Sequence, residues 1–342
     1  MSGSGPRPRG ILMSNDVTQA PFGTVFGEHL PIARFDGDQW SAAEVVPLNS
    51  VQFGPQTHAL HYASACFEGL KAHRQTDGSV ALFRAEKNVA RLRGSAERLV
   101  LPVPPTALCE ELFSLAASRN ADVTPPAPGS LYLRPTLIGT DPNIGAAGKP
   151  SKTAALYVIA SPVGEYLPPH PLRILVETEL PRTTPQFGVV KAGANYCMAL
   201  GQLTRARQDW NADQILFAAG GLVEETGAAN FILLDEGHLV TPAQTDAFLH
   251  GITKDSLLQL ARARGWTVEE RGITVEDLRE WAARPTGEMA LSGTAAILGG
   301  VGELIIDGEV VQVGTGETGP ATKALRAELQ SIQRGERTFE FR

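Results

Sequence analysis

The feature that most limits how this chain can fold is a proline-rich stretch near its middle, residues 165–171 (EYLPPHP). Three prolines in seven residues stiffen the backbone, so the stretch is suited to a crossing between two domains. The chain has 342 residues, which is more than a single ordinary core accommodates. We therefore expect a smaller N-terminal α+β domain over 21–164, a linker over 165–171 and a larger C-terminal α/β domain over 172–342.

Before the linker, short runs rich in Val, Phe and Ile lie between Gly and Pro, a pattern typical of antiparallel strands. Farther on, apolar residues recur at helical spacing in a segment that carries Arg91. We expect strands at 22–35 and 44–53 as the start of an antiparallel meander, helices at 85–99 and 105–119, and buried strands at 131–139 and 154–163.

After the linker the pattern changes to strands that alternate with helices, which is typical of an α/β or α+β layer. We expect strands at 172–178, 215–218 and 230–234, and helices at about 195–209, 253–264 and 275–282. The first 20 residues are rich in Gly, Ser, Pro and Arg and have no apolar core of a secretory signal. They predict a disordered lead-in over 1–20, within which Met13 is a candidate for the true start.

Composition excludes several classes of function. A net charge of −7 argues against nucleic acid or an anionic membrane as the main partner. No run approaches the roughly 18 apolar residues of a membrane span. The three cysteines (Cys66, Cys109 and Cys197) are scattered, which excludes a disulfide framework and a cysteine-based zinc site. We expect a soluble protein of the cytoplasm.

The first chemical candidate is the lysine of residues 191–196 (KAGANY). Only seven of the thirty basic residues are lysines, and Lys191 follows the apolar run Phe187–Val190. An amine taken out of water favours its neutral form, and a neutral amine attacks an aldehyde to form a Schiff base. The alternative is an ordinary lysine at a strand-to-helix turn with its head in solvent, as most lysines are.

The second candidate is an acid, Glu225, at the start of the turn in 221–234 (GLVEETGAANFILL). A carboxylate that precedes a Gly-Ala-Ala turn into an apolar strand is placed to face a buried basic nitrogen. The alternative is an exposed acid at a turn, which on its own is the commoner case.

Two further segments are candidates for binding an anion. Gly251 and Thr253 open an amphipathic helix, and the free N–H groups at a helix start attract anions. Residues 291–298 (LSGTAAIL) offer hydroxyls and bare N–H groups between two apolar runs. In the alternative interpretation Thr253 only caps the helix, and 291–298 is only a turn.

Other chemistries fail on inspection. Residues 145–150 (GAAGKP) lack the spacing and the Ser or Thr of a phosphate-binding loop, and no G-x-G-x-x-G follows a strand. His58 and His61 have no accompanying ligand set, so no metal site is expected. No G-x-S-x-G elbow supports serine hydrolysis. A lysine, an acid, a phenol, an arginine-bearing helix and two anion-binding turns instead suit pyridoxal phosphate.

Six motifs in this order carry a family resemblance: ALHYASACFEGLKAHR, LYLRPTLIGT, KAGANY, EETGAAN, GITKDSLLQLA and LSGTAA. Together they closely resemble the branched-chain amino acid aminotransferases, which are fold-type IV pyridoxal phosphate enzymes. The resemblance runs from about Phe22 to the C-terminal helix. It implies a two-domain mixed α/β (α+β) fold with pyridoxal 5′-phosphate between the domains, and at least a homodimer.

The resemblance also implies an activity. This is transamination of L-Leu, L-Ile and L-Val with 2-oxoglutarate, which gives branched-chain 2-oxo acids and L-glutamate and belongs to branched-chain amino acid biosynthesis. Lys191 looks like the lysine that forms the Schiff base and shuttles the proton. Glu225 matches the acid on the pyridine nitrogen, and Tyr196 the phenol on the 3-oxygen. The phosphate residues of the family match Arg91, Ile252, Thr253 and Thr294.

The substrate side is implied in the same way. The family places aromatic residues around the aliphatic side chain, backbone N–H groups on the α-carboxylate, and an arginine suited to the distal carboxylate of glutamate. The matching positions are Tyr62, Phe67, Tyr132 and Tyr166 for the aromatics, Ala295 and Ala296 for the backbone, and Arg134 for the arginine. The loop 141–149 is expected to approach the partner's site.

The chain departs from the family pattern at a few positions, and other functions of the same fold are alternatives. Ala194 stands where a glycine is common, Cys197 has no assigned role, and 296–299 (AILG) replaces the Cys-x-x-Cys pair of some relatives. Within the fold, D-amino acid transamination and aminodeoxychorismate lyase activity are the alternatives. A non-catalytic phosphate-ligand binding protein is the alternative from another class.

Overall fold

The computed structural model describes residues 19–166, 168 and 170–342. Met13 and most of the expected lead-in lie outside the described residues, as do Leu167 and Pro169 of the expected linker. The described strands form two sheets, one built from 29–163 and the other from 172–312. The division into two domains at 165–171 stays a proposal, which this arrangement supports.

The first sheet has seven strands in the order β2-β1-β7-β6-β4-β5, with β3 paired to β6. All of its described pairs are antiparallel. The longest contact joins β6 and β7, which pair over ten residues each. The strands are β1 (His29–Phe35), β2 (Glu44–Pro47), β3 (Ala65–Phe67), β4 (Leu70–Arg74), β5 (Val80–Leu82), β6 (Ser130–Gly139) and β7 (Ala154–Val163).

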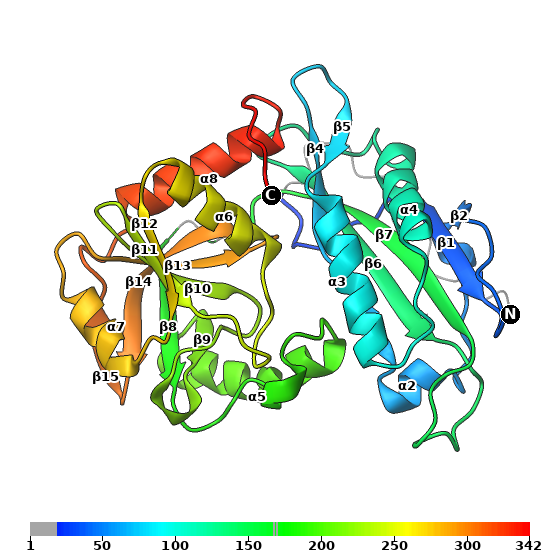
Figure 1. Ribbon diagram of the computed structural model, residues 1–342, viewed down its shortest axis with the longest axis horizontal. Helices are drawn as coiled ribbons and strands as arrows, with labels where there is room; N and C mark the ends of the chain where they lie inside the picture. Colours follow the sequence, from blue (N-terminus) through cyan, green and yellow to red (C-terminus); the bar gives the residue numbers. More distant parts are fainter. Residues whose placement is uncertain (1–18, 167, 169) are drawn as a thin grey trace, which may run out of the picture.

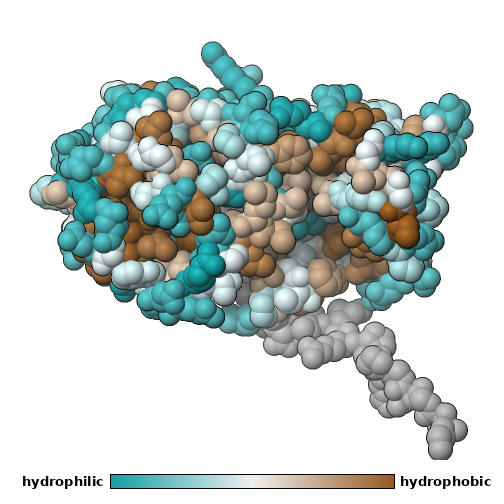
Figure 2. Space-filling model, turned by 90° about the horizontal axis from the view of Figure 1, so that it is seen from below, coloured by the Kyte–Doolittle hydropathy of each residue, from teal (hydrophilic) through white to brown (hydrophobic). Residues whose placement is uncertain are grey.

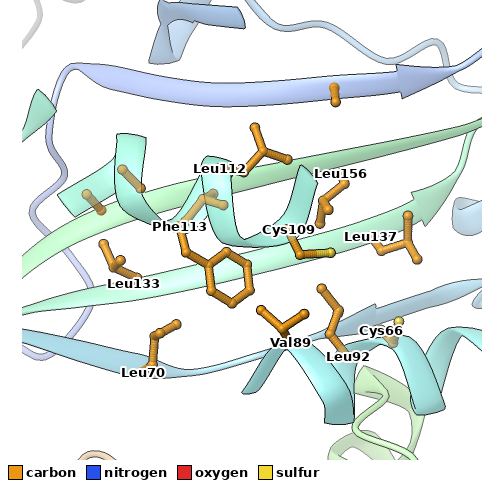
Figure 3. Packing of buried hydrophobic residues seen from close by; sticks show 14 of the residues in the cluster. Cys66, Leu70, Val89, Leu92, Cys109, Leu112, Phe113, Leu133, Leu137 and Leu156 are labelled. Carbon is orange, nitrogen blue, oxygen red and sulfur yellow. The ribbon is translucent and has the colours of Figure 1, made fainter. Parts of the chain in front are cut away.

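Two helices cover one face of this sheet, α3 (Ala85–Arg98) and α4 (Thr106–Arg119). Figure 3 shows their apolar side chains meeting those of the strands, with Phe113 near Leu133 and Leu92 near Cys66. Removing a buried leucine from such a core typically costs about 2–5 kcal/mol. Because α3, α4 and the strands share these buried side chains, they form one hydrophobic core. A short helix, α2 (His58–Tyr62), lies outside this core.

The second sheet has eight strands in the order β12-β11-β10-β13-β14-β8-β9, with β15 paired to β14. It is mixed, because β11/β12, β14/β8 and β8/β9 are parallel pairs. Its strands are β8 (Leu172–Glu177), β9 (Gln214–Phe217), β10 (Asn230–Asp235), β11 (His238–Pro242), β12 (Thr267–Arg271), β13 (Glu288–Gly293), β14 (Ile297–Ile306) and β15 (Glu309–Gln312). Its helices are α5 (Gly193–Trp210), α6 (Ile252–Ala263), α7 (Val275–Ala282) and α8 (Pro320–Gln333).

Helix α3, which covers the first sheet, lies on the side of that sheet toward the second sheet (Figure 1). Four residues on it or beside it contact segments of the second half of the chain. Three of them are arginines and one is a serine, and each makes polar contacts. They are Arg84 to Asp255 and Ser256, Arg91 to His250, Ser95 to Lys191, and Arg98 to Gln186 and Asp246.

The structure corrects the sequence-based expectation in four places. The strand expected at 22–35 begins only at His29, because the chain turns at Gly23, whose φ is +73°. The strand expected at 44–53 ends at Pro47 and passes into a 3₁₀ turn. The meander is wrong in its connection, since β1 pairs with β2 on one side and with the distant β7 on the other. In the second half, β13, β14 and β15 follow one another without a helix between them.

Candidate active site

Lys191 lies between a 3₁₀ turn (Pro185–Phe187) and the start of α5. Its neighbours Val190 and Ala192 are buried, and its own side chain is half-buried. The Nζ atom donates a hydrogen bond to the Tyr196 hydroxyl at 2.9 Å and lies 5.1 Å from the centre of the Phe67 ring. The amine is thus held against a phenol and an aromatic face instead of extending freely into solvent.

The backbone around Lys191 is also held. Its N–H donates to Ser95 Oγ at 3.1 Å, and its carbonyl accepts from the Phe67 N–H at 3.0 Å. Asn195 is buried, and its amide donates to the carbonyls of Val190 and Phe187 at 2.8 and 2.9 Å. The segment that carries the lysine is therefore fixed by residues from both halves of the chain.

Glu225 is 3% exposed, so the alternative of an exposed acid at a turn is wrong. Arg182 Nη2 lies 2.7 Å from its carboxylate, and the Leu249 N–H and Asn230 Nδ2 donate to it at 3.0 and 3.3 Å. Burial raises the pKa of Glu225, although Arg182, the Leu249 N–H and Lys191 all favour the charged form. The carboxylate is an acceptor suited to a basic N–H in an enclosed space.

Arg91 reaches from α3 to two partners. Its Nε and Nη2 donate to the carboxylate of Glu68 at 2.7 and 2.9 Å, and its Nη1 donates to the His250 carbonyl at 2.9 Å. Glu68 is fully buried; burial would raise the pKa of its carboxyl, but Arg91, together with Lys191 and Asn88, lowers it. This pair holds the guanidinium beside the residue that precedes Gly251, at the entry to α6.

The N-terminus of α6 begins after Gly251, and no side chain caps it. Thr253 is the second residue of the helix and not its cap, so the alternative in which Thr253 only caps α6 is wrong. The first N–H groups of a helix have no partner within it, and they carry the positive end of the helix dipole. With Arg91 next to them, Ile252 and Thr253 open a site suited to a phosphate.

The turn 294–296 connects β13 to β14. Two hydrogen bonds tie it to the strand segment of the first sheet: Thr294 Oγ1 donates to the Gly69 carbonyl, and Lys71 Nζ donates to the Ala295 carbonyl, both at 3.0 Å. A Cβ on Gly293 would lie 3.7 Å from the Ala228 carbonyl, so this turn approaches the turn that follows Glu225.

Most of the expected substrate residues form one aromatic group. The Phe67 and Tyr196 ring centres are 5.4 Å apart, and the Arg134 guanidinium lies 4.5 Å from the Phe67 centre. Arg134 donates to the Tyr132 hydroxyl at 2.9 and 3.2 Å. Phe22, which was not expected, joins Tyr132 and Tyr166 at 5.0 and 5.1 Å.

Tyr62 does not join this group. Its ring centre lies 4.9 Å from that of His58, and its hydroxyl donates a hydrogen bond to the Ile144 carbonyl. Tyr62 therefore contacts the loop 141–149, and none of its described contacts is with Phe67, Tyr132 or Arg134. His58 Nδ1 is paired with Ser64 Oγ at 2.8 Å, which accounts for this histidine as a structural residue.

Sequence reasoning missed the residues that act on the expected ones through long-range contacts. Arg182, Glu68, Asn230, Ser95 and Lys71 are all buried and polar. Glu68 and Lys71 lie within ALHYASACFEGLKAHR and Asn230 lies within EETGAAN, so the motifs contained them without marking their role. No sequence motif around Arg182 or Ser95 marks either residue as part of the site.

The set fits the group that the resemblance implied, pyridoxal 5′-phosphate. A lysine amine, a buried carboxylate, a phenol and an arginine beside an uncapped helix start match its aldehyde, ring nitrogen, hydroxyl and phosphate. Among residues 19–166, 168 and 170–342, no three His, Cys, Asp or Glu side chains gather as metal ligands. No helix in the same residues is both long and apolar enough to cross a membrane.

Comparison with known proteins agrees with this geometry. The model of the family described as amino-transferase class IV matches residues 65–295. The branched-chain-amino-acid aminotransferase of Mycobacterium tuberculosis is 38% identical over 332 residues, covering 92% of this chain and 88% of the relative. Branched-chain-amino-acid transaminase 1 of Bacillus subtilis is 34% identical over 332 residues, covering 94% and 92%.

A solved structure shows the same fold. The branched-chain amino acid aminotransferase of Thermobaculum terrenum, solved in its PLP form, has a TM-score of 0.74 and covers 91% of this chain and 95% of its own. At 21% identity this likeness concerns the fold alone. Fold, motifs and full-length relatives agree, and the chain belongs to the class IV aminotransferases, within the branched-chain-amino-acid aminotransferase family.

Proposed function

We propose that this pyridoxal phosphate aminotransferase exchanges amino groups between L-leucine, L-isoleucine or L-valine and 2-oxoglutarate, with Lys191 as its catalytic residue. The observation that carries the proposal is the position of the Lys191 amine, which is 2.9 Å from the Tyr196 hydroxyl and next to the Phe67 ring. Bound pyridoxal phosphate supplies an aldehyde for the lysine and a ring that withdraws electrons from the substrate's Cα.

Lys191 then acts as the base of the reaction. Its Nζ accepts the proton from the Cα of the amino acid, and the Tyr196 oxygen that accepts its hydrogen bond keeps the amine aimed at one place. The Phe67 ring on the same amine limits the access of water. Holding the base close to the carbon in this way replaces an encounter in solution by a positioned group.

Glu225 and Arg91 have the binding roles. Glu225 accepts a hydrogen bond from the ring nitrogen and, as a carboxylate, keeps that nitrogen protonated, while Arg182 supplies the countercharge. Arg91 and the N–H groups of Ile252 and Thr253 bind the phosphate, and the Thr294 hydroxyl joins them by turning from the Gly69 carbonyl to which it donates.

The substrate pocket combines an apolar wall with one cation. Phe67, Tyr132 and Tyr166 surround an aliphatic side chain, and the N–H groups of Ala295 and Ala296 bind the α-carboxylate. Arg134 rests against Phe67 and the Tyr132 hydroxyl, from which it can turn toward the distal carboxylate of glutamate. Leucine and glutamate can therefore use the same pocket in alternation.

We also propose a homodimer. Helix α5 exposes Met198 and Leu200, which are 50% and 56% accessible, and Figure 2 shows apolar patches on the face of the molecule where α5 lies. Tyr62 and the loop 141–149 stand away from the pocket of their own chain, which is what a contribution to a partner's pocket requires. A sedimentation measurement that gave the mass of one chain would contradict this proposal.

A cytoplasmic location is proposed from the cysteines. Cys66, Cys109 and Cys197 are free thiols, and burial raises the pKa of the Cys109 thiol to about 12, which keeps it unreactive. Cell fractionation that recovered the protein outside the cytoplasm would contradict this location.

The test of the function is a set of half-reactions on the purified protein loaded with pyridoxal phosphate. We expect visible absorbance of the lysine-bound cofactor, and its bleaching by L-Leu, L-Ile and L-Val but not by D-Ala or aminodeoxychorismate. The Lys191→Ala variant should lose both the absorbance and the amino transfer, and the exposed Lys323→Ala variant on α8 should keep both. Normal absorbance in Lys191→Ala would contradict the assignment of Lys191 as the lysine that binds the cofactor.

A further inference from the structure

Ser95 lies on α3 one helical turn after Arg91, so the two side chains extend from the same face of the helix. Ser95 is 2% exposed, and its Oγ accepts the N–H of Lys191 at 3.1 Å. The two residues in this bond are 96 positions apart in the sequence. One short stretch of α3 thus contacts both the lysine and the entry to the anion site.

The bond completes a clamp on the Lys191 backbone. The other polar backbone group of Lys191, its carbonyl, accepts the N–H of Phe67 at 3.0 Å. Both partners belong to the first half of the chain, whereas the side chain of Lys191 is directed to Tyr196 on α5 in the second half. The position of Lys191 therefore depends on the first half as much as on its own segment.

The helix that carries Ser95 is anchored at several points. Arg91 donates to the His250 carbonyl at 2.9 Å, and Arg84 lies 2.7 Å from Asp255 in the first turn of α6. The inner face of α3 packs in the core through Leu92 and Ala96, both without exposed surface. A displacement of Lys191 relative to Arg91 would have to break the Ser95 bond or bend this helix.

We propose that Ser95 is a positioning residue: its hydroxyl holds the backbone of Lys191, so that α3 sets the separation between the lysine amine and the phosphate-binding Arg91. The proposal rests on the function given above, because the separation matters only for a ligand that is bound at both ends. A shift of about 1 Å in a reacting group can lower a rate about 100-fold, so this fixed separation contributes directly to the reaction rate.

The experiment compares Ser95→Thr with Ser95→Val. These two side chains have nearly the same shape and differ in the hydroxyl that accepts the Lys191 N–H. In the full chain, with and without pyridoxal phosphate, hydrogen exchange of the peptide 188–194 should speed up at one amide by about tenfold in Ser95→Val relative to Ser95→Thr. With the loaded enzyme, kcat should be about tenfold lower in Ser95→Val, with KM for leucine nearly unchanged.

Equal exchange and equal kcat in the Thr and Val variants would overturn the proposal, and so would an equal rise of KM with unchanged kcat. If the added methyl group prevents folding of both variants, Ser95→Ala makes the same comparison without added volume. Its control is Ser118→Ala, which removes a hydroxyl from the exposed side of α4. If the unaltered protein binds no pyridoxal phosphate, the proposed function fails, while the exchange measurement still decides whether Ser95 holds Lys191.

Discussion

Arg182 and Glu225 form an ion pair whose side chains are each 4% exposed. Both charged groups are buried, so their mutual attraction is needed to offset the free-energy cost of removing each of them from water. Glu225 also accepts the Leu249 N–H and an amide hydrogen of Asn230, and Arg182 Nη2 also donates to the Gly188 carbonyl at 3.3 Å. Arg182 therefore links the candidate acid to the segment that leads to Lys191.

Removing Arg182 should affect both stability and chemistry. In Arg182→Met the carboxylate loses its countercharge in a buried place, and the free energy of unfolding should fall by about 3–5 kcal/mol. The loss of the positive charge also raises the pKa of Glu225 further, so its acid form gains population and no longer holds a proton on the ring nitrogen. Denaturant unfolding and the rate of the leucine half-reaction measure the two effects.

A second substitution separates these two causes. Glu225→Gln removes the unpaired charge, so the Arg182→Met/Glu225→Gln double variant should recover much of the lost stability. It should not recover the half-reaction, because a neutral amide cannot keep the ring nitrogen protonated. Recovery of both quantities together would mean that Glu225 has no role beyond its pairing with Arg182.

At the scale of elements, the start of α6 depends on a close approach of two segments. A Cβ on Gly251 would lie 2.0 Å from Asn230 Oδ1, although the φ of Gly251 is an ordinary −73°. The Asn230 side chain cannot simply turn away, since it donates to Glu225 and to the Leu249 carbonyl. Glycine is needed here for space and not for conformation.

Gly251→Ala should therefore push Asn230 out of place and disturb both the acid and the uncapped helix start. We expect at least a tenfold weaker binding of pyridoxal phosphate, measured by titration of the visible absorbance, because the phosphate contacts and the Glu225 contact are lost together. Gly94→Ala in α3 is the control: apart from the backbone of its own helix, nothing lies within 4 Å of the added Cβ, and alanine should stabilise the helix by about 1 kcal/mol. Equal cofactor binding in both variants would show that Gly251 is not constrained.

Much of the element pattern could be predicted from the sequence, and the reason is periodicity. The helices at 85–98, 252–263 and 275–282 were expected within a residue or two, because apolar residues recur at helical spacing there. The pairing of β1 with β7 could not be predicted, since it depends on a distant part of the chain.

The same limit applied to the site. Lys191, Glu225 and Arg91 were expected from motifs, but Arg182 and Ser95 act through partners 43 and 96 positions away, and no local pattern marks such pairs. The environment of Glu225 likewise depends on the long-range contacts of its carboxylate with Arg182 and the Leu249 N–H.

At the scale of the whole molecule, one buried histidine lies where the two halves meet. His73 on β4 is 6% exposed, and its Nε2 has no hydrogen-bond partner among the described residues. Burial, reinforced by Lys71 on the same strand and Arg334 just after α8, lowers the pKa of His73 to about 3. The folded protein therefore keeps this ring neutral where an unfolded chain would protonate it.

This difference makes the protein sensitive to acid. An imidazole with a lowered pKa gives its full contribution above the unfolded value near 6.5 and loses it as the pH falls toward 3. Between about pH 6.5 and about pH 5 the unaltered protein should lose about 2 kcal/mol of unfolding free energy that His73→Gln does not lose. Denaturant unfolding of both proteins over this range measures the difference, and parallel curves would rule out His73 as the source.

Ser95 on α3 precedes Lys191 by 96 residues, a distance along the chain that also orders their synthesis. Because N-terminal domains generally fold first during synthesis, much of the surface that presents Arg91 and Ser95 can form before the second half of the chain is complete. The segment that carries the Lys191 amine would then dock against a surface of the first half that has already folded. In this order of events the active site of a newly made chain is completed last, once the second half has folded against the first.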